Sequence, residues 1–275
     1  MEYTMTVLEG IGKTDRQRIA DVLRGTKGTI SVKETADILG VNARNAAKML
    51  SRWTKKGWMS RVRQGLYVPV PLESDSPDVS LENPWLVAQK LYSPCYIGGW
   101  SAAEYFDLTE QIFSTIMVMT LQKPRDRQPK YKDQSFLIRT VPESAMFGLK
   151  PVWQGQVKIM ISDPARTLAD MLIYPACGGG IRMVKEMLAR LIETRPGMLE
   201  NLLVYGKQLG NGGLFKRLGF LLEVLNFGDE AVLADCQSQL TAGNAKLDPA
   251  LENPRLVTRW RLWVPENWKE MANHD

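Results

Sequence analysis

The sequence predicts an α+β protein, in which a small basic domain of three helices and a hairpin precedes a larger mixed α/β domain. Residues 1–70 hold 13 Lys and Arg against 6 Asp and Glu, a net +7, whereas the remaining residues hold 22 against 24. Residues 71–80, PLESDSPDVS, are polar and Pro-containing without periodicity, which is typical of an interdomain connection. We therefore expect domains at residues 1–72 and 81–275.

Capping signals mark the first two helices. A Ser or Thr followed three residues later by Glu or Gln has the spacing of a capping box, in which both side chains satisfy free backbone N–H groups. The two pairs are Thr14 with Gln17 and Ser31 with Glu34. Apolar residues then recur at helical spacing, and a glycine ends each segment, at Gly25 and at Gly40.

A third helix, capped by Asn42 and running to about Gly57, divides into two faces when successive residues are turned by about 100°. The basic and amide-bearing face holds Arg44, Asn45, Lys48, Arg52, Lys55 and Lys56. The apolar face holds Ala46, Met49, Leu50 and Trp53. A helix in the DNA major groove needs this division, because its polar side chains face base edges and phosphates while its back packs on the other helices. An ordinary amphipathic surface helix also has one polar and one apolar face, so this alternative stays open.

A basic hairpin follows. Met59–Arg63, the turn Gln64-Gly65 and Leu66–Val70 have the pattern of two short strands around a tight turn. Arg61 and Arg63 are two residues apart, so both point to one face and can reach the DNA backbone or minor groove. Helix, helix, turn, helix and hairpin is the order of a winged helix-turn-helix. We expect contacts with double-stranded DNA from Arg44, Asn45, Lys48, Arg52, Lys55, Arg61 and Arg63.

The larger domain is expected to mix helices and strands. Helices are predicted at Pro84–Tyr92, from Ser101 (in a capping box with Glu104) to about Leu108, after the N-cap Asp163, and at about 181–194, 198–206, 213–226 and 229–240. Strands are predicted at Ile112–Thr120, Ser135–Val141, Gln156–Ser162 and Val257–Val264.

Composition excludes several kinds of chemistry. His274 is the single histidine and lies next to the C-terminus, which argues against a Ser-His-Asp triad or a histidine metal cluster. Cys95, Cys177 and Cys236 are far apart, which indicates a reduced, cytoplasmic protein without a disulfide framework or zinc site. No run approaches the ~20 apolar residues of a membrane span, and no signal peptide is apparent. We expect no catalytic residues, no metal and no cofactor.

Three weaker patterns have a functional and a plain interpretation. Gly178–Gly180 precedes a helix and could bind phosphate, or form an ordinary loop. Glu104, Asp107 and Glu110 could act in acid–base or metal chemistry, or be a capping residue and solvated carboxylates. A Pro-containing stretch could be a second phosphate-binding loop, a partner surface or a solvated loop; its cations are Lys123, Arg125, Arg127, Lys130 and Lys132.

Three blocks of the chain resemble the AbiEi family, the antitoxins of bacterial type IV toxin–antitoxin pairs. They are Gln64–Val68 (QGLYV), Cys95–Thr115 with its IGGWSA sequence, and Asp163–Asp170 (DPARTLAD). The resemblance implies that the winged helix represses its own operon by binding inverted repeats in the promoter DNA. Arg44, Asn45, Lys48 and Arg52 would then contact DNA from the third helix, and Arg61 and Arg63 from the wing.

The resemblance also implies that the second domain counters a nucleotidyltransferase-like toxin, with or without direct contact, and it identifies no toxin-countering residues. The chain has neither the Gly-Ser pair nor the Asp-x-Asp pair of a nucleotidyltransferase site. Two other classes stay open: a transcription regulator that senses a small ligand, and a nucleic-acid-processing enzyme targeted by its winged helix.

Overall fold

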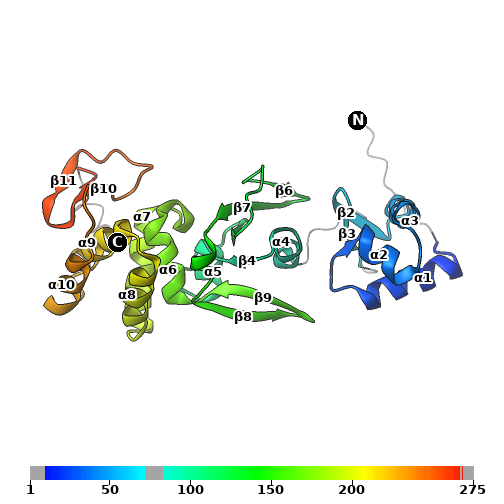
Figure 1. Ribbon diagram of the computed structural model, residues 1–275, viewed down its shortest axis with the longest axis horizontal. Coiled ribbons are helices and arrows are strands. Elements are labelled where there is room, and N and C mark those ends of the chain that lie inside the picture. The colour runs from blue at the N-terminus through cyan, green and yellow to red at the C-terminus, as the bar shows by residue number, and fades with distance from the viewer. Residues whose placement is uncertain (1–9, 72–82, 267, 269–275) are drawn as a thin grey trace.

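The protein is α+β, with a winged helix-turn-helix at the N-terminus and a larger mixed α/β part after it (Figure 1). The computed structural model describes residues 10–71, 83–266 and 268. The winged helix lies at one end, a sheet lies in the middle, and a helical layer lies at the other end. The connection predicted at residues 71–80 and the histidine His274 fall outside the described residues, apart from Pro71.

Within residues 10–71, three helices pack on a three-stranded antiparallel sheet of order β1-β3-β2. The elements are α1 (Lys13–Gly25), β1 (Ile30–Ser31), α2 (Val32–Leu39), α3 (Ala43–Lys55), β2 (Met59–Arg63) and β3 (Leu66–Pro69). Their shared core buries Ile19, Val22, Ile30, Leu50, Trp53, Met59 and Tyr67. This core fixes α3 against the other two helices and the hairpin.

One of the two predicted capping boxes forms. The amide of Glu34 donates to Ser31 Oγ at 3.2 Å, and the amide of Ser31 donates to Glu34 Oε2 at 3.0 Å. Gly40 ends α2 in the left-handed region with φ 62°. The box predicted at Thr14 was wrong, because α1 begins at Lys13 with Gly12 as its N-cap and has no side-chain cap.

Helices and strands alternate irregularly from residue 83 to residue 162. The elements are α4 (Pro84–Tyr92), β4 (Cys95–Ile97), α5 (Gly99–Tyr105), β5 (Thr115–Thr120), β6 (Lys130–Tyr131), β7 (Gln134–Thr140), η1 (Glu143–Ala145), β8 (Leu149–Gln154) and β9 (Val157–Ser162). Within the described chain, six strands form a mixed sheet of order β6-β7-β5-β4-β9-β8, with β4–β9 and β5–β7 parallel and the other pairs antiparallel.

The remaining elements form the helical layer. They are α6 (Pro164–Ile173), η2 (Pro175–Gly178), α7 (Ile181–Thr194), α8 (Met198–Leu209), α9 (Gly212–Val224), α10 (Glu230–Ser238), β10 (Ala245–Lys246), β11 (Arg255–Val257), η3 (Thr258–Trp260) and β12 (Leu262–Val264). The last three strands form a small sheet of order β10-β12-β11. The three cysteines are free and buried.

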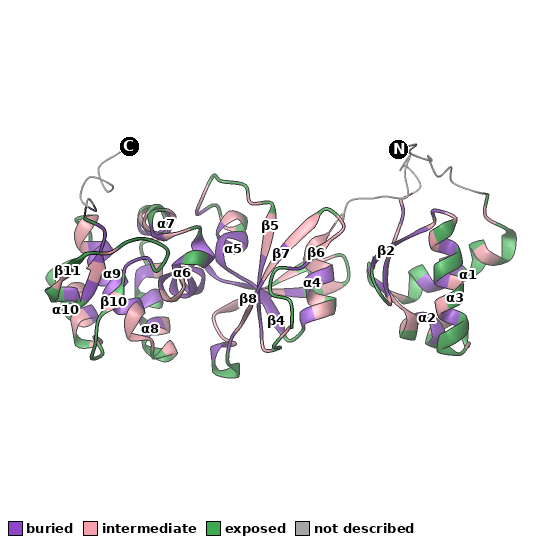
Figure 2. Cartoon of the chain, turned by 90° about the horizontal axis from the view of Figure 1, so that it is seen from above, coloured by how far each residue is buried: buried purple, intermediate pink, exposed green. Residues whose placement is uncertain are grey.

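The inner strands β4 and β5 are largely buried, whereas the edge strands β6 and β8 contain no buried residue (Figure 2). Successive side chains of a strand point to opposite faces. Cys95 and Ile97 accordingly pack with α4, while Tyr96 between them packs on the other side. Helix α4 therefore separates the sheet from the winged helix, and the helical layer lies beyond the sheet.

Two predicted elements of the larger part were wrong in detail. Helix α5 begins at Gly99 with Gly98 as N-cap, so Ser101 lies inside it; Ser101 Oγ accepts a hydrogen bond from the amide of Met117 at 2.9 Å. The strand predicted at Val257–Val264 is interrupted by η3 and by Arg261, whose φ is 50°. Helices α4 and α7 have the predicted bounds, and the other predicted helices and strands are present with shifted ends. Strands β4, β6, β8 and β10 were not predicted.

In the part of the chain that the structure describes, every helix is too short or too polar to cross a lipid bilayer.

Candidate nucleic-acid interface

Helix α3 presents one charged face to solvent and buries the other. Asn42 caps the helix, with its Oδ1 accepting from the amide of Asn45 at 2.9 Å. Ala46, Leu50 and Trp53 are fully buried. The five predicted contact residues on the opposite face are all exposed, namely Arg44, Asn45, Lys48, Arg52 and Lys55. The structure therefore brings these side chains together on one helix face.

Partners within the chain distinguish the cations of α3. Among the described residues, the side chains of Arg44, Lys48 and Lys55 form no ion pair or hydrogen bond. Arg52 differs, because its Nη2 donates to Asp15 Oδ1 of α1 at 2.6 Å. Arg44, Lys48 and Lys55 are thus available to an external anion, whereas Arg52 is held at the α1–α3 contact.

The wing forms as the hairpin pattern predicted. Strands β2 and β3 are antiparallel, with Gly65 at φ 79° in the turn and a register shift between Arg61 and Arg63. Both arginines are exposed. The Nε of Arg61 donates to the carbonyl of Arg63 at 3.4 Å, so the tip of the wing orders one guanidinium.

The apolar side of the wing packs on the larger domain. Val62 and Leu66 are 8% and 3% exposed and belong to the same hydrophobic cluster as Val87 of α4. The wing thus exposes its arginine-bearing side and buries its apolar side. Because the wing and α4 share a core, the orientation of the winged helix is tied to the central sheet.

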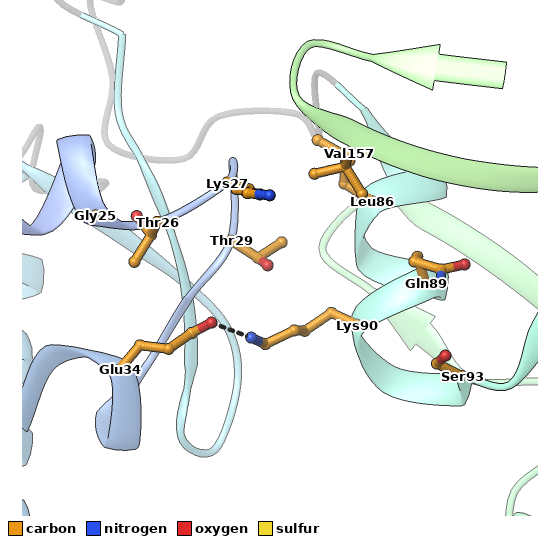
Figure 3. A pocket seen from close by; sticks show the side chains of 10 residues that line it. All are labelled: Gly25, Thr26, Lys27, Thr29, Glu34, Leu86, Gln89, Lys90, Ser93 and Val157. Carbon is orange, nitrogen blue, oxygen red and sulfur yellow. Dashed lines mark hydrogen bonds and ion pairs between the residues drawn. The ribbon is translucent and has the colours of Figure 1, made fainter. Parts of the chain in front are cut away.

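An open pocket and an ion pair lie at the same junction (Figure 3). The pocket has a volume of about 390 Å³, and Lys27 of the winged helix and Gln89 of α4 are among the residues that line it. Lys90 of α4 pairs with Glu34 of α2, as the dashed line shows. Burial raises the pKa of Glu34, but hydrogen bonds from Lys90 and Ser31 outweigh it and leave that pKa below its ordinary value.

The glycine run does not offer an open phosphate site. Gly180 precedes α7 with φ 101°, and the first helical amide, that of Ile181, donates to Asp248 Oδ2 at 2.9 Å. Asp248 is 3% exposed. A carboxylate of the chain itself therefore occupies the helix N-terminus, where a negative charge is favoured.

The acidic trio does not converge on one point. Glu104 Oε2 accepts from the amide of Phe113 at 3.4 Å. Asp107 is exposed with φ 57°, and Glu110 lies 3.6 Å from Arg190 in an exposed ion pair. No group of three His, Cys, Asp or Glu residues in the described chain could hold a metal ion.

A buried charged network was missed by the sequence reasoning. Arg166 Nη2 donates to Asp170 Oδ1 and to Tyr96 Oη, each at 2.9 Å, and Tyr96 Oη donates to Asp170 Oδ2 at 2.9 Å. Arg166 is 0% exposed. The available signal was an Arg and an Asp four residues apart in a helix with apolar neighbours. Since the network ties β4 to α6 without reaching solvent, it is structural.

One comparison with known proteins covers only the winged helix, and another covers nearly the whole chain. Residues 17–70 match the family model described as "Transcriptional regulator, AbiEi antitoxin". The crystal structure of the RV2827C protein from Mycobacterium tuberculosis is similar over nearly the whole length, with a TM-score of 0.59 and 14% identity. The alignment covers 94% of this chain and 93% of that one. At this identity the likeness shows a shared fold. No curated protein matches the chain. The winged helix and wing, at residues 17–70, therefore match the AbiEi family of antitoxins and transcriptional regulators.

Proposed function

We propose that the protein is an antitoxin of a type IV toxin–antitoxin system, and that it represses its own operon by binding inverted repeats in the promoter DNA. The observation that carries the DNA-binding claim is the exposed face of α3, where Arg44, Lys48 and Lys55 have no partner among the described residues. The match of residues 17–70 to a family of antitoxins and transcriptional regulators supports both activities for the protein.

The geometry of α3 and the wing supports one assignment of the DNA contacts. Residues near the N-terminus of a recognition helix contact base edges in the major groove, so Arg44, Asn45 and Lys48 are assigned to that role. Lys55 and Arg52, further along the helix, are assigned to phosphates. Arg61 and Arg63 reach the neighbouring backbone or minor groove from the wing.

We assign the two activities to two domains, residues 1–72 for DNA binding and residues 81–275 for countering the toxin. The toxin is proposed to be a nucleotidyltransferase-like protein encoded beside this chain, and the site of action is the cytoplasm. Neither activity requires catalysis, a cofactor or a metal from the chain. No residue of the larger domain is assigned to neutralisation.

The test of repression uses a reporter gene behind the promoter of the chain's own operon. The full-length protein should repress the reporter, and Arg44→Ala/Lys48→Ala should relieve repression by at least tenfold, since each lost base contact costs about 1–3 kcal/mol. Arg182→Ala/Arg255→Ala is the matched control, because both residues are exposed and lie in α7 and β11. Equal repression by the parent and by Arg44→Ala/Lys48→Ala would contradict the assignment of α3 to DNA binding.

The same variant tests whether neutralisation is separate from DNA binding. Cells that express the neighbouring toxin should resume growth when either the parent or Arg44→Ala/Lys48→Ala is supplied, because the substitutions leave the larger domain intact. Rescue by neither protein would contradict the antitoxin assignment while leaving the reporter result unaffected.

A further inference from the structure

A second exposed basic segment lies in the larger domain and runs from the connection after β5 to the first residue of β6. It comprises Lys123, Arg125, Arg127 and Lys130, all exposed, and is called the 123–130 loop below. No ion pair or hydrogen bond within the described residues engages these four side chains. The one carboxylate among them, Asp126, accepts from the amide of Gln128 at 2.9 Å. The loop therefore carries unpaired positive charge.

Contacts around α4 place this loop beside the wing. Tyr131, which follows the loop, lies with its Oη 2.8 Å from Tyr92 Oη of α4. Tyr92 is buried in the hydrophobic cluster that includes Val62 and Leu66 of the wing, and Tyr131 packs against that cluster. The wing and the segment that carries the loop thus share one core.

Electrostatics agree with this placement. Burial and the hydrogen bond with Tyr131 raise the pKa of Tyr92, whereas the positive charge of Arg63 lowers it and the charge of Asp126 raises it. The charges of Arg63 in the wing and of Asp126 in the loop therefore both act on Tyr92.

The proposed DNA surface and the loop also lie on the same side of the molecule. In Figure 1, α3 and β6 both lie along the upper side, with β2 between them. Figure 2 looks down on that side. It shows the winged helix, which contains α3, next to the central sheet, which contains β6. A duplex seated on α3 and crossing the wing would continue toward the loop, because DNA is stiff over about 150 base pairs.

We propose that the 123–130 loop is a second DNA-binding site, which contacts phosphates of the duplex beyond the wing. The inference rests on the proposed DNA binding by α3. Exposed Lys and Arg without internal partners can neutralise phosphates and release counterions. A protein partner fits less well: the exposed large apolar side chains of the described residues all lie outside 121–133, and protein interfaces use such side chains as anchors.

The test measures affinity for an arbitrary-sequence duplex of about 40 base pairs as salt is varied, since phosphate contacts do not depend on sequence. The variant is full-length Lys123→Ser/Arg125→Ser/Arg127→Ser. Its slope of log K against log salt should be flatter by about 2–3, and its affinity at 0.1 M salt should fall at least about tenfold. The matched control, Arg182→Ser/Lys246→Ser/Arg255→Ser, removes the same charge from α7, β10 and β11.

Each alternative outcome has a distinct meaning. If the loop variant keeps the parental slope while Arg44→Ala/Lys48→Ala flattens it, the loop site is wrong and the proposed function stands. If the control loses as much affinity as the loop variant, net charge explains the effect and the loop site is again wrong. A parent that binds no duplex overturns the proposed function and this inference together. A loop variant that keeps the parental slope but no longer rescues growth assigns the loop to a protein partner instead.

Discussion

Asp15 holds one of the α3 cations in an ion pair, so under the proposed function it limits the charge that α3 offers to DNA. Its Oδ1 accepts from Arg52 Nη2 at 2.6 Å, and its side chain is 19% exposed against 50% for the arginine. An ion pair at this exposure contributes about 0–1 kcal/mol to stability, so its removal leaves the fold intact. The pair therefore acts mainly on the charge of the proposed DNA surface, because it holds one cation and adds one negative charge.

Asp15→Asn should consequently tighten DNA binding by about threefold and steepen the salt dependence by up to about one unit, because it releases the Arg52 guanidinium. Fluorescence anisotropy with the promoter fragment measures both. Asp21→Asn is the matched control, since Asp21 is also on α1 and pairs with Arg24. Unchanged affinity in Asp15→Asn would show that Arg52 has no access to the duplex.

The buried network also makes a prediction at the scale of single residues. Asp170→Ala leaves the guanidinium of Arg166 charged and unpaired in the interior, which costs about 3–5 kcal/mol. Tyr96→Phe removes one hydrogen-bonding hydroxyl and should cost about 1–3 kcal/mol. Denaturant unfolding of the full-length protein measures both. Equal losses in the two variants would contradict the assigned role of the charge.

Individual elements differ in how far the sequence predicted them. Ser31 caps α2 because it has extended backbone angles, with φ −101° and ψ 160°, while the pair at Thr14 has only the right spacing. Gly12 takes the extended N-cap position of α1, which leaves Thr14 inside the helix. Spacing alone therefore cannot identify a cap, since the N-cap conformation depends on the preceding chain.

Ser31 and Thr14 allow a matched test, because only Ser31 caps a helix. Ser31→Ala should lower the free energy of unfolding by about 1 kcal/mol, because the amide of Glu34 loses its acceptor. Thr14→Ala should change it by less than about 0.5 kcal/mol, since Thr14 is exposed and caps nothing. Thermal or denaturant unfolding compares them. A loss in Thr14→Ala as large as that in Ser31→Ala would contradict the structural assignment.

Strands were harder to predict than helices. Strand β8 was missed because Pro151 interrupts its sequence, LKPVWQ, and proline is confined to edge strands such as this one. Strand β4 is buried on both faces, so its three residues show no alternation. The order of strands in the sheet depends on contacts between distant segments, which periodicity does not report.

At the scale of the whole molecule, the uneven charge distribution predicted that the N-terminal part would carry an exposed basic face, and α3 has one. The docking of the wing on α4 was not predictable, because Val62 and Leu66 look like ordinary strand residues in the sequence. Their burial depends on Val87 and the sheet behind it. The candidate DNA residues could be identified from helical spacing, whereas the Arg52–Asp15 pair and the place of the 123–130 loop required the fold.

The ion pair between Lys90 and Glu34 gives the docking a pH dependence. The pKa of Glu34 lies below its ordinary value of 4.5, so this group contributes stability above that value and loses it as pH falls through the lowered pKa. Glu34→Gln keeps an acceptor for Ser31 but should show a smaller loss of unfolding free energy between about pH 6 and pH 3. Parallel pH profiles for both proteins would contradict this assignment.

The most direct measurement of the central claim is the affinity of the full-length protein for its own promoter fragment across a range of salt concentrations. The account predicts tight, salt-dependent binding by the parent, and for Arg44→Ala/Lys48→Ala a weaker affinity with a slope flatter by up to about two units. Binding by that variant with the affinity and slope of the parent would contradict the claim that α3 reads DNA.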